Sequence, residues 1–361
     1  RRINLLRTVI VTLLISWPLS TIPSAKAQEP AHSPPPDQAL QTSLSVENTA
    51  TAEQISAWSM PDVTYPSANP YSKNKAALGR KLFFDPRLSG NPSRTCAACH
   101  HPGLGWSDSM QRALGNQQGL GRHTPSLINV GYNKAFFWDG RATSLEDAVS
   151  QDMLSPGMEY DEKPGNIVKR ISAIAAYRKE FGNTFTSGGV TFERIADALA
   201  TFLRGIRSSS TPFDRWLLGD AEAIPDSAKR GFALFTGKAM CAGCHIAPNF
   251  TDSSFHNTGT NTVDPGYYEI SGRDEDRNAF KTPSLRDVAL TPPYMHNGSK
   301  TTLTEIIDYY NRGGDTLNGG NELQPLHLTA AEKADLLAFL LSLSGEAPET
   351  VIPALPLALM P

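Results

Sequence analysis

The chain has 361 residues, of which 40% are hydrophobic and 19% are charged, and its 33 basic and 36 acidic side chains give a net charge of −3. This balance is typical of a folded protein with a sizeable core, and the length fits about two domains. A nucleic-acid-binding protein would show a basic surplus, so the charge argues against that class. The four cysteines are too few to form a disulfide scaffold for a chain of this length.

The N-terminal segment has the features of a secretory signal peptide. Basic residues precede a short apolar run, Thr8–Trp17, which is followed by small residues and an Ala-x-Ala site at 25–27. A run of about ten apolar residues is too short to cross a bilayer, which needs about 20. We therefore expect export to the periplasm, cleavage after Ala27 and no stable membrane insertion. Residues 28–361 carry 29 basic and 36 acidic side chains, a net charge of −7.

Two further segments are expected to lack a folded core. Residues 28–59 are rich in Pro, Ala, Ser, Thr and Gln and carry little large apolar surface, which predicts a flexible leader. Residues 347–361 include four prolines, which favour an extended tail along the surface.

All the cysteines occur in two copies of one motif, Cys96-Ala97-Ala98-Cys99-His100 and Cys241-Ala242-Gly243-Cys244-His245. In C-x-x-C-H the two thiols are spaced to form thioethers with the vinyl groups of a haem, and the adjacent histidine can ligate the iron. We therefore expect two covalently bound haem c groups. His100 would be the proximal ligand of the first haem iron and His245 that of the second.

The alternative roles for these cysteines are a zinc site with four thiolate ligands and a pair of disulfides. A zinc site would require the two C-x-x-C pairs to meet across a separation of 142 positions, and it would leave the histidine after each pair without a role. Two haem motifs behind an export signal are the more economical interpretation.

The sequence downstream of each haem motif repeats. Residues Thr124–Leu127 match Thr282–Leu285 at an offset of 158, and further pairs follow at the same offset without a gap: Val130 with Val288, Gly140 with Gly298, Thr143 with Thr301, and Leu145 with Leu303. Such self-similarity predicts two related domains in tandem.

We expect a haem domain at residues 60–210, a second at 211–346, and a boundary near 208–212. Apolar residues at helical spacing predict helices over these ranges: 75–84, 167–181, 195–206, 303–310 and 330–344, with a further helix beginning near 226. No convincing alternating strand pattern occurs. The expected fold is mostly α, with two tandem cytochrome c-like haem domains and long loops.

Several motifs in consistent order resemble the bacterial di-haem cytochrome c peroxidase and MauG superfamily. Besides the two haem motifs, they are Leu82-Phe83-Phe84-Asp85-Pro86-Arg87-Leu88-Ser89, Phe137-Trp138-Asp139-Gly140-Arg141, Leu285-Arg286-Asp287-Val288-Ala289-Leu290-Thr291 and Pro293-Tyr294-Met295-His296. The resemblance covers residues 75–345. It implies a periplasmic enzyme in which the N-terminal haem reacts with hydrogen peroxide and the C-terminal haem stores or relays electrons.

The resemblance also implies which residues move protons and electrons. Cleavage of peroxide needs a group that moves a proton from the inner to the outer oxygen. The family's glutamate is best matched by Glu159, with Glu146 as the alternative, and a solvated surface carboxylate is the competing interpretation. The family's accompanying glutamine is matched by Ala148, so the hydrogen bonds in this pocket must differ. Trp138 matches a tryptophan that the family places between the haems, although it would also serve as a core aromatic.

The sixth ligand of the second haem iron distinguishes subgroups. The family uses methionine in the peroxidases proper and tyrosine in MauG, and the matching residue here is Tyr310. Its spacing from Leu303 and Ile307 places it on the buried face of a helix, whereas Tyr309 is expected to lie off that face. Met295 and His296 are competing ligands, and a plain core tyrosine is the remaining alternative.

Two departures from the family's pattern concern the first haem and calcium. The peroxidases proper carry a histidine in the loop after the first motif that blocks the oxidised enzyme, and residues 106–121 contain none. We therefore expect the first haem to be open without reductive activation.

The family's calcium is held by two carbonyls, matched by Thr291 and Pro293, and by an asparagine, matched by His123. Histidine is a poor ligand for calcium, so calcium is doubtful here.

The sequence thus favours a MauG-like di-haem peroxidase. Its expected partners are hydrogen peroxide and either a small cytochrome or copper protein as electron donor or a protein substrate, with no nucleic acid. One alternative is a cytochrome c peroxidase that detoxifies peroxide. An alternative of another class is a non-catalytic electron carrier with two closed haems.

Overall fold

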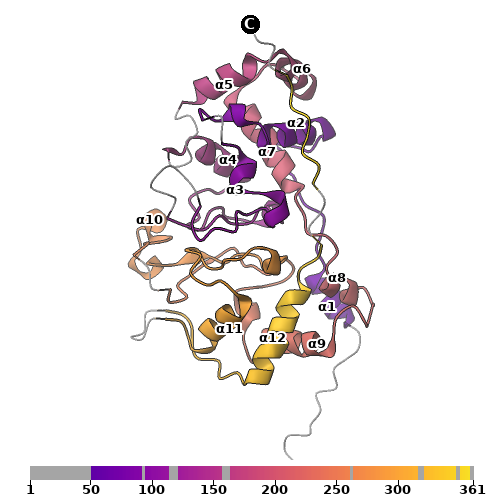
Figure 1. Ribbon diagram of the computed structural model, residues 1–361, viewed down its shortest axis with the longest axis vertical. Coiled ribbons are helices and arrows are strands. Elements are labelled where there is room, and N and C mark those ends of the chain that lie inside the picture. Colours follow the sequence, from indigo (N-terminus) through magenta and orange to yellow (C-terminus); the bar gives the residue numbers. More distant parts are fainter. Residues whose placement is uncertain are drawn as a thin grey trace, which may run out of the picture. The chain divides into compact units, whose positions relative to one another are not determined.

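The structure is a computed structural model that describes residues 50–91, 94–113, 121–156, 163–260, 263–315, 321–346 and 350–357. It is mostly α, as the sequence predicted, and the strands within these ranges are the short antiparallel pair β1 (Phe255–His256) and β2 (Phe280–Lys281) (Figure 1). Within the described ranges no helix has the length and apolar character needed to cross a bilayer. The expected signal peptide lies outside the described residues.

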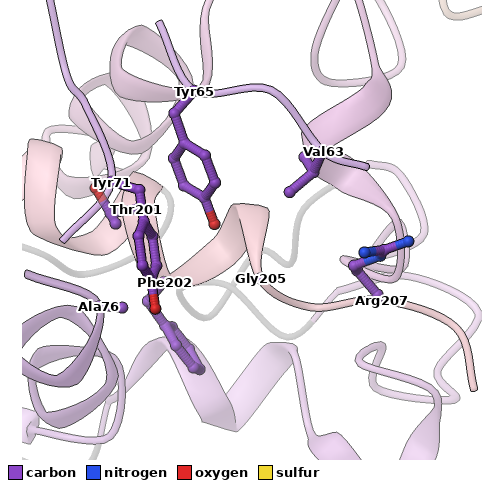
Figure 2. Close-up of a pocket in the computed structure, with 8 residues that line it drawn as sticks. All are labelled: Val63, Tyr65, Tyr71, Ala76, Thr201, Phe202, Gly205 and Arg207. Carbon is purple, nitrogen blue, oxygen red and sulfur yellow. The ribbon is translucent and has the colours of Figure 1, made fainter. Parts of the chain in front are cut away.

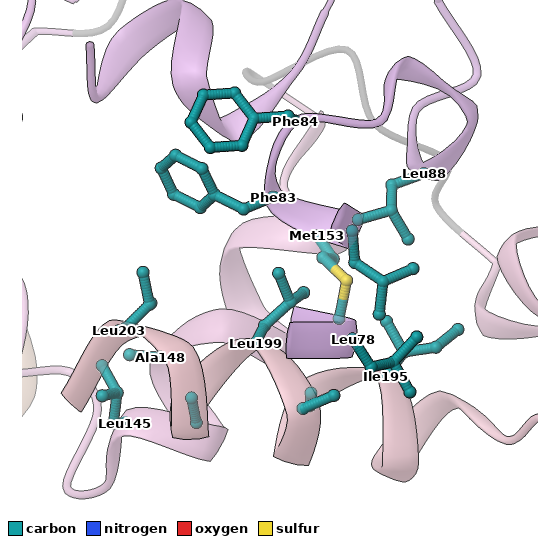
Figure 3. Close-up of a cluster of buried hydrophobic side chains, with 14 of the residues drawn as sticks. Leu78, Phe83, Phe84, Leu88, Leu145, Ala148, Met153, Ile195, Leu199 and Leu203 are labelled. Atoms are coloured by element: carbon teal, nitrogen blue, oxygen red, sulfur yellow. The ribbon is translucent and has the colours of Figure 1, made fainter. Parts of the chain in front are cut away.

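The N-terminal half is built on two crossing helices, α2 and α7, with α4 packed on α7 (Figure 3). Its helices are α2 (Lys73–Phe83), α3 (Cys96–Cys99), α4 (Leu145–Met153), α5 (Pro164–Ser172), α6 (Ala175–Thr184) and α7 (Phe192–Arg204). The single helix expected at 167–181 is wrong, because Ile174 has extended backbone and separates α5 from α6. Its side chain is buried in the same core as α2 and α7.

The C-terminal half repeats this plan with α9 crossing α12. Its helices are α8 (Pro212–Leu217), α9 (Asp226–Thr236), α10 (Tyr268–Ser271), α11 (Leu303–Asn311) and α12 (Ala330–Ser342). Helices α11 and α12 each begin at a threonine that forms a capping box with a glutamate three residues later, which explains why both start where they do. The boundary expected near residues 208–212 falls between α7 and α8.

The leader expected to be flexible through residue 59 ends earlier than this. Residues Ala52–Trp58 form α1, which begins with a capping box at Thr51. The Trp58 ring packs 4.6 Å from the ring centroid of Phe250 and 5.4 Å from that of Phe232. The Trp58 carbonyl accepts a hydrogen bond from Arg286 Nη2 at 3.0 Å. The expectation failed because one buried tryptophan anchors a segment whose average composition is polar.

The backbone confirms the 158-residue repeat. Helix α4 is equivalent to α11, and the isolated bridge between Phe136 and Ala142 is equivalent to that between Tyr294 and Lys300. The helix crossings also correspond. A Cβ on Gly79 would lie 1.9 Å from the carbonyl oxygen of Ala198 in α7, and a Cβ on Gly231 would lie 2.0 Å from that of Asp335 in α12. Only glycine permits such close approach of two helices.

The C-terminal tail runs along the N-terminal half (yellow trace in Figure 1). Arg87 Nη1 donates a hydrogen bond to the Pro356 carbonyl at 2.9 Å, and Arg80 donates one to the Val351 carbonyl. Residues 350–357 form no helix or strand, in agreement with the extended tail that the prolines predicted.

Candidate haem sites

Each C-x-x-C-H motif forms one tight turn that ends at its histidine. The backbone N–H of His100 donates to the Cys96 carbonyl, and that of His245 donates to the Cys241 carbonyl, both at 2.9 Å. His100 Nδ1 lies 3.1 Å from the carbonyl oxygen of Trp106, and His245 Nδ1 lies 2.9 Å from that of Phe250. A carbonyl can only accept, so Nδ1 carries the hydrogen and Nε2 keeps a lone pair.

The electrostatic setting of both histidines suits iron ligation. Burial lowers the pKa of His100 and of His245 below the usual value for histidine, although each carbonyl partner acts in the opposite direction. The rings are therefore neutral at physiological pH, which is the form that binds metal. An Nδ1–H bonded to a carbonyl also fixes the orientation of a ligating imidazole.

The cysteines form neither of the alternative sites. All four thiols are free. The metal-ligand cluster found among the described residues is Cys244 with Asp252 and His256, so the four thiolates do not come together as a zinc site would require. Two thiols and an oriented imidazole on one turn fit haem c at both motifs.

Tyr310 lies beside the second motif, and Tyr309 requires a correction. Tyr310 is half-buried. Burial raises the pKa of its hydroxyl above the usual value, and the charges of Cys241, Tyr309 and Cys244 raise it further, which is consistent with a position near the haem-attachment turn. The expectation that Tyr309 lies off the buried face is wrong: Tyr309 is 0% exposed. Its hydroxyl donates to the Thr258 carbonyl at 2.6 Å, because a loop covers that side of α11.

The acid/base candidates of the N-terminal half are only partly described. Glu159 lies outside the described residues. The Glu146 carboxylate accepts hydrogen bonds from Arg204 Nη1 at 2.6 Å, from Arg204 Nη2 at 2.8 Å and from Asn69 Nδ2 at 2.6 Å. These bonds hold the pKa of Glu146 below its usual value even though burial acts to raise it. Glu146 therefore ties α4 to α7 and is a structural carboxylate in this arrangement.

Asp152, in the last turn of α4, was not identified from the sequence. Burial raises the pKa of its carboxyl to about 6, against the opposing effect of Arg141. The charge of Asp152 in turn contributes to the raised pKa of the Cys99 thiol. The repeat offset of 158 pairs Asp152 with Tyr310, and this signal was present in the sequence.

Trp138 joins the two halves of the chain. Its indole Nε1 donates to the His123 carbonyl at 2.8 Å, and its own carbonyl accepts from the backbone N–H of Lys281 at 2.8 Å. Its ring centroid lies 6.5 Å from that of His296. Trp138 thus contacts both haem domains, and its place between the haems stays a prediction.

Arg122 makes a second link between the halves. It donates to Asp139 at 2.5 Å in the F-W-D-G-R motif, and its Nε and Nη2 form a bidentate pair with Asp264 at 2.6 and 2.8 Å. This residue was not identified from the sequence, because the pairing depends on a loop contact across 142 positions.

The calcium site implied by the family does not fit the residues present. His123, at the asparagine position, is buried, and its Nδ1 donates to the Met110 carbonyl at 2.7 Å. Its remaining nitrogen lies 3.5 Å from Ser107 Oγ. An imidazole held in this way offers no oxygen ligand, so we derive no role for calcium at Thr291 and Pro293.

A separate pocket lies beside α7, between the start of the N-terminal domain and the C-terminal end of that helix (Figure 2). It is lined by Val63, Tyr65, Tyr71, Ala76, Thr201, Phe202, Gly205 and Arg207. The ring of Phe202 packs 6.0 Å from that of Trp106. The pocket contains none of the haem-motif residues.

Comparisons with known proteins agree with this geometry. Residues 73–222 match the family described as di-haem cytochrome c peroxidase, and residues 228–344 match cytochrome c. The methylamine utilization protein MauG of Methylorubrum extorquens is 44% identical over 300 residues, covering 81% of this chain and 85% of that protein. The cytochrome-c peroxidase IdrP2 of Denitromonas iodatirespirans is 35% identical, covering 81% and 87%.

A solved structure shows the same fold. The crystal structure of a MauG-like protein associated with microbial copper homeostasis aligns with a TM-score of 0.72 and 33% identity, covering 80% of this chain and 94% of that one.

The chain has two cytochrome c-like domains, each with one haem motif. It is therefore an oxidoreductase of the peroxidase class with two covalently bound haem c groups. The chain belongs to the di-haem cytochrome c peroxidase and MauG family.

Proposed function

We propose that the protein is a periplasmic MauG-like peroxidase that uses hydrogen peroxide at the haem attached through Cys96 and Cys99, with His100 as its proximal ligand. His245 and Tyr310 would ligate the haem attached through Cys241 and Cys244, which would relay or store oxidising equivalents. The observation that carries this proposal is the difference between equivalent helices: α11 offers Tyr310, whereas α4 offers the shorter Asp152.

The difference in side-chain length supports different roles for the two sites. A tyrosine hydroxyl extends past its ring, so Tyr310 of α11 would serve as a second ligand for an iron held by His245. An aspartate carboxylate ends much closer to its own helix, so Asp152 of α4 would leave an iron held by His100 accessible to a small ligand. The absence of histidine from residues 106–121 supports the same conclusion.

The residues of the chain then have separate tasks in the reaction. The bound haems supply the redox chemistry, and the neutral Nε2 atoms of His100 and His245 hold the two irons. Glu159 is the acid/base candidate for cleavage of the O–O bond, on the strength of the resemblance. Trp138, which contacts both domains, passes an electron between them. Two electrons and two protons convert peroxide to two waters, and the electrons are replaced by the donor.

The donor is either a small cytochrome or copper protein or a side chain of a protein substrate that becomes oxidised. The chain is similar both to a MauG protein, at 44% identity, and to a cytochrome-c peroxidase, at 35% identity. The greater similarity to MauG and the tyrosine at position 310 favour the MauG-like assignment. Detoxification of peroxide with electrons from a small redox protein is the second candidate. The signal-peptide pattern of residues 1–27 supports the periplasm.

Rapid mixing of the ferric holoprotein with peroxide tests the proposal. We expect a change in the haem absorption spectrum that persists when reduced cytochrome c is added. Rapid loss of that change, with oxidation of the cytochrome, would instead establish the detoxifying peroxidase. Absence of any change would establish an electron carrier.

A further inference from the structure

Asp152 and Tyr310 occupy the same position in the two haem domains. Helices α4 and α11 begin at Leu145 and Leu303 and have the same length, so the offset of 158 holds throughout both helices. If Tyr310 lies opposite His245 as proposed, then Asp152 lies opposite His100. The charge interactions agree: besides burial, Cys244 raises the pKa of Tyr310, and Asp152 raises the pKa of Cys99, the equivalent cysteine of the first motif.

The packing of α4 directs Asp152 inward. Leu145, Ala148 and Asp152 are spaced i, i+3 and i+7, so they share one helix face. Leu145 is 3% exposed and Ala148 is 8% exposed, and Figure 3 shows both beside Leu203 of α7. Ala148 stands where the family's glutamine is expected and has no polar group. Asp152, which is half-buried, is therefore the polar side chain of this face, one turn beyond Ala148.

The Asp152 carboxyl is not used to hold the fold together. It forms no side-chain hydrogen bond or ion pair with the described residues, whereas two other acids of α4 are engaged. Glu146 pairs with Arg204, and Asp147 accepts hydrogen bonds from Gln151 Nε2 at 3.1 Å. Desolvating a carboxylate without a partner is costly, so such a group in a cofactor pocket points to a chemical role.

Among the residues that the structure describes, few charges lie around Asp152. Arg141, in the loop before α4, favours the ionised carboxylate. Cys99 of α3 faces it as a thiol and would be an uncharged thioether once haem is attached. On α7, which packs against α4, Arg204 is committed to Glu146. The pKa of Asp197 on α7 is raised by burial and depends on the charges of Glu146 and Lys75 rather than on that of Asp152.

We propose that Asp152 is the proton acceptor of the first haem pocket and takes the proton that a ligand loses when it binds opposite His100. This inference rests on the proposed function. Peroxide transfers the proton of its inner oxygen to an Asp152 carboxylate oxygen. When the O–O bond breaks, the outer oxygen takes a proton from the acid/base group of the proposed function and leaves as water. The two bound haems would supply the two electrons for this cleavage, and the donor would replace them.

Cyanide binding tests Asp152 without any peroxide chemistry, because hydrogen cyanide must also give up its proton when it binds ferric haem. In the wild-type holoprotein, we expect the association rate at the first haem to rise with pH and to level off above about pH 6, as Asp152 ionises. Asp152→Asn should lower the rate about 100-fold and remove the inflection. Asp152→Glu should retain an inflection, and Asp147→Asn, the same change on another face of α4, should behave as wild type.

An unchanged cyanide profile in Asp152→Asn would overturn the inference. The same result in a protein that still reacts with peroxide would leave the proposed function standing. The opposite combination of results is also informative. If Asp152→Asn loses the cyanide inflection but the wild-type protein does not react with peroxide, the role of Asp152 is supported and the proposed function is overturned.

Discussion

The carbonyl of Trp138 accepts a hydrogen bond from the backbone N–H of Lys281 at 2.8 Å. The tryptophan of one haem domain is therefore fixed by a strand of the other. Since its indole N–H is also bonded, to the His123 carbonyl, the ring has one defined orientation between the domains. Under the proposed function, this fixed ring is the route for an electron between the two haems.

Replacing Trp138 by Phe tests that route. Phenylalanine keeps most of the packing and the backbone hydrogen bond from Lys281, but it is harder to oxidise and lacks the N–H. We expect the peroxide-dependent spectral change at the second haem to slow by an order of magnitude, while the reaction at the first haem keeps its rate. Stopped-flow absorption follows both. Equal rates at the second haem in Trp138→Phe and in the wild type would exclude the indole from the route.

Glu146→Gln tests whether the Glu146 carboxylate has a structural or a catalytic role. Loss of the paired charge beside Arg204 should lower the free energy of unfolding by about 2 kcal/mol at pH 7. The peroxide reaction should be unchanged. Chemical denaturation and stopped-flow mixing measure the two effects, and a large loss of peroxide reactivity in a stably folded variant would contradict the structural assignment.

The stability difference should also depend on pH. The pKa of Glu146 is lowered in the folded protein, so its contribution is present above the unfolded value of 4.5 and is lost as the pH falls through the folded value. The difference in the free energy of unfolding between wild type and Glu146→Gln should therefore become smaller below about pH 4.5. A difference that grows on acidification would show that Arg204 does not hold the Glu146 carboxyl ionised.

Gly231→Ala tests the helix crossing of the C-terminal domain. The new Cβ would lie 2.0 Å from the Asp335 carbonyl oxygen, so α9 and α12 must separate. We expect a loss of about 3 kcal/mol in the free energy of unfolding. Gly182→Ala in α6, where a Cβ meets no atom within 4 Å, is the matched control and should stabilise by about 0.5–1 kcal/mol. Equal effects of the two substitutions would refute the close crossing.

Trp58→Ala tests whether α1 belongs to the folded domain. Removing a ring that is 8% exposed and packed on Phe232 and Phe250 should cost about 3 kcal/mol. Ser56→Ala, at an exposed position of the same helix, should leave thermal unfolding unchanged. If Trp58→Ala has the same melting temperature as the wild type, α1 does not stabilise the domain, and the prediction of a flexible leader through residue 59 would stand.

The sequence was most informative where chemistry requires particular residues at fixed spacing. The two C-x-x-C-H motifs predicted the haem class, and the 158-residue repeat predicted equivalent helices that the structure confirms. Prediction failed where distant segments decide the outcome. The burial of Tyr309 depends on the loop at Thr258, and the docking of α1 depends on the hydrophobic cluster that Trp58 forms with residues of α8, α9 and Phe250. Asp152 was missed because a lone carboxylate in a helix carries no local signal, and its pairing with Tyr310 shows only when the repeat is followed through both helices.

The most direct test of the central claim is the EPR spectrum of the ferric holoprotein, compared between wild type and Tyr310→Phe. We predict one high-spin haem, the open site of His100, and one low-spin haem ligated by His245 and Tyr310. In Tyr310→Phe both haems should be high-spin, because phenylalanine cannot ligate iron. Two low-spin haems in the wild type, or an unchanged low-spin signal in Tyr310→Phe, would contradict the proposed ligation and the open first haem.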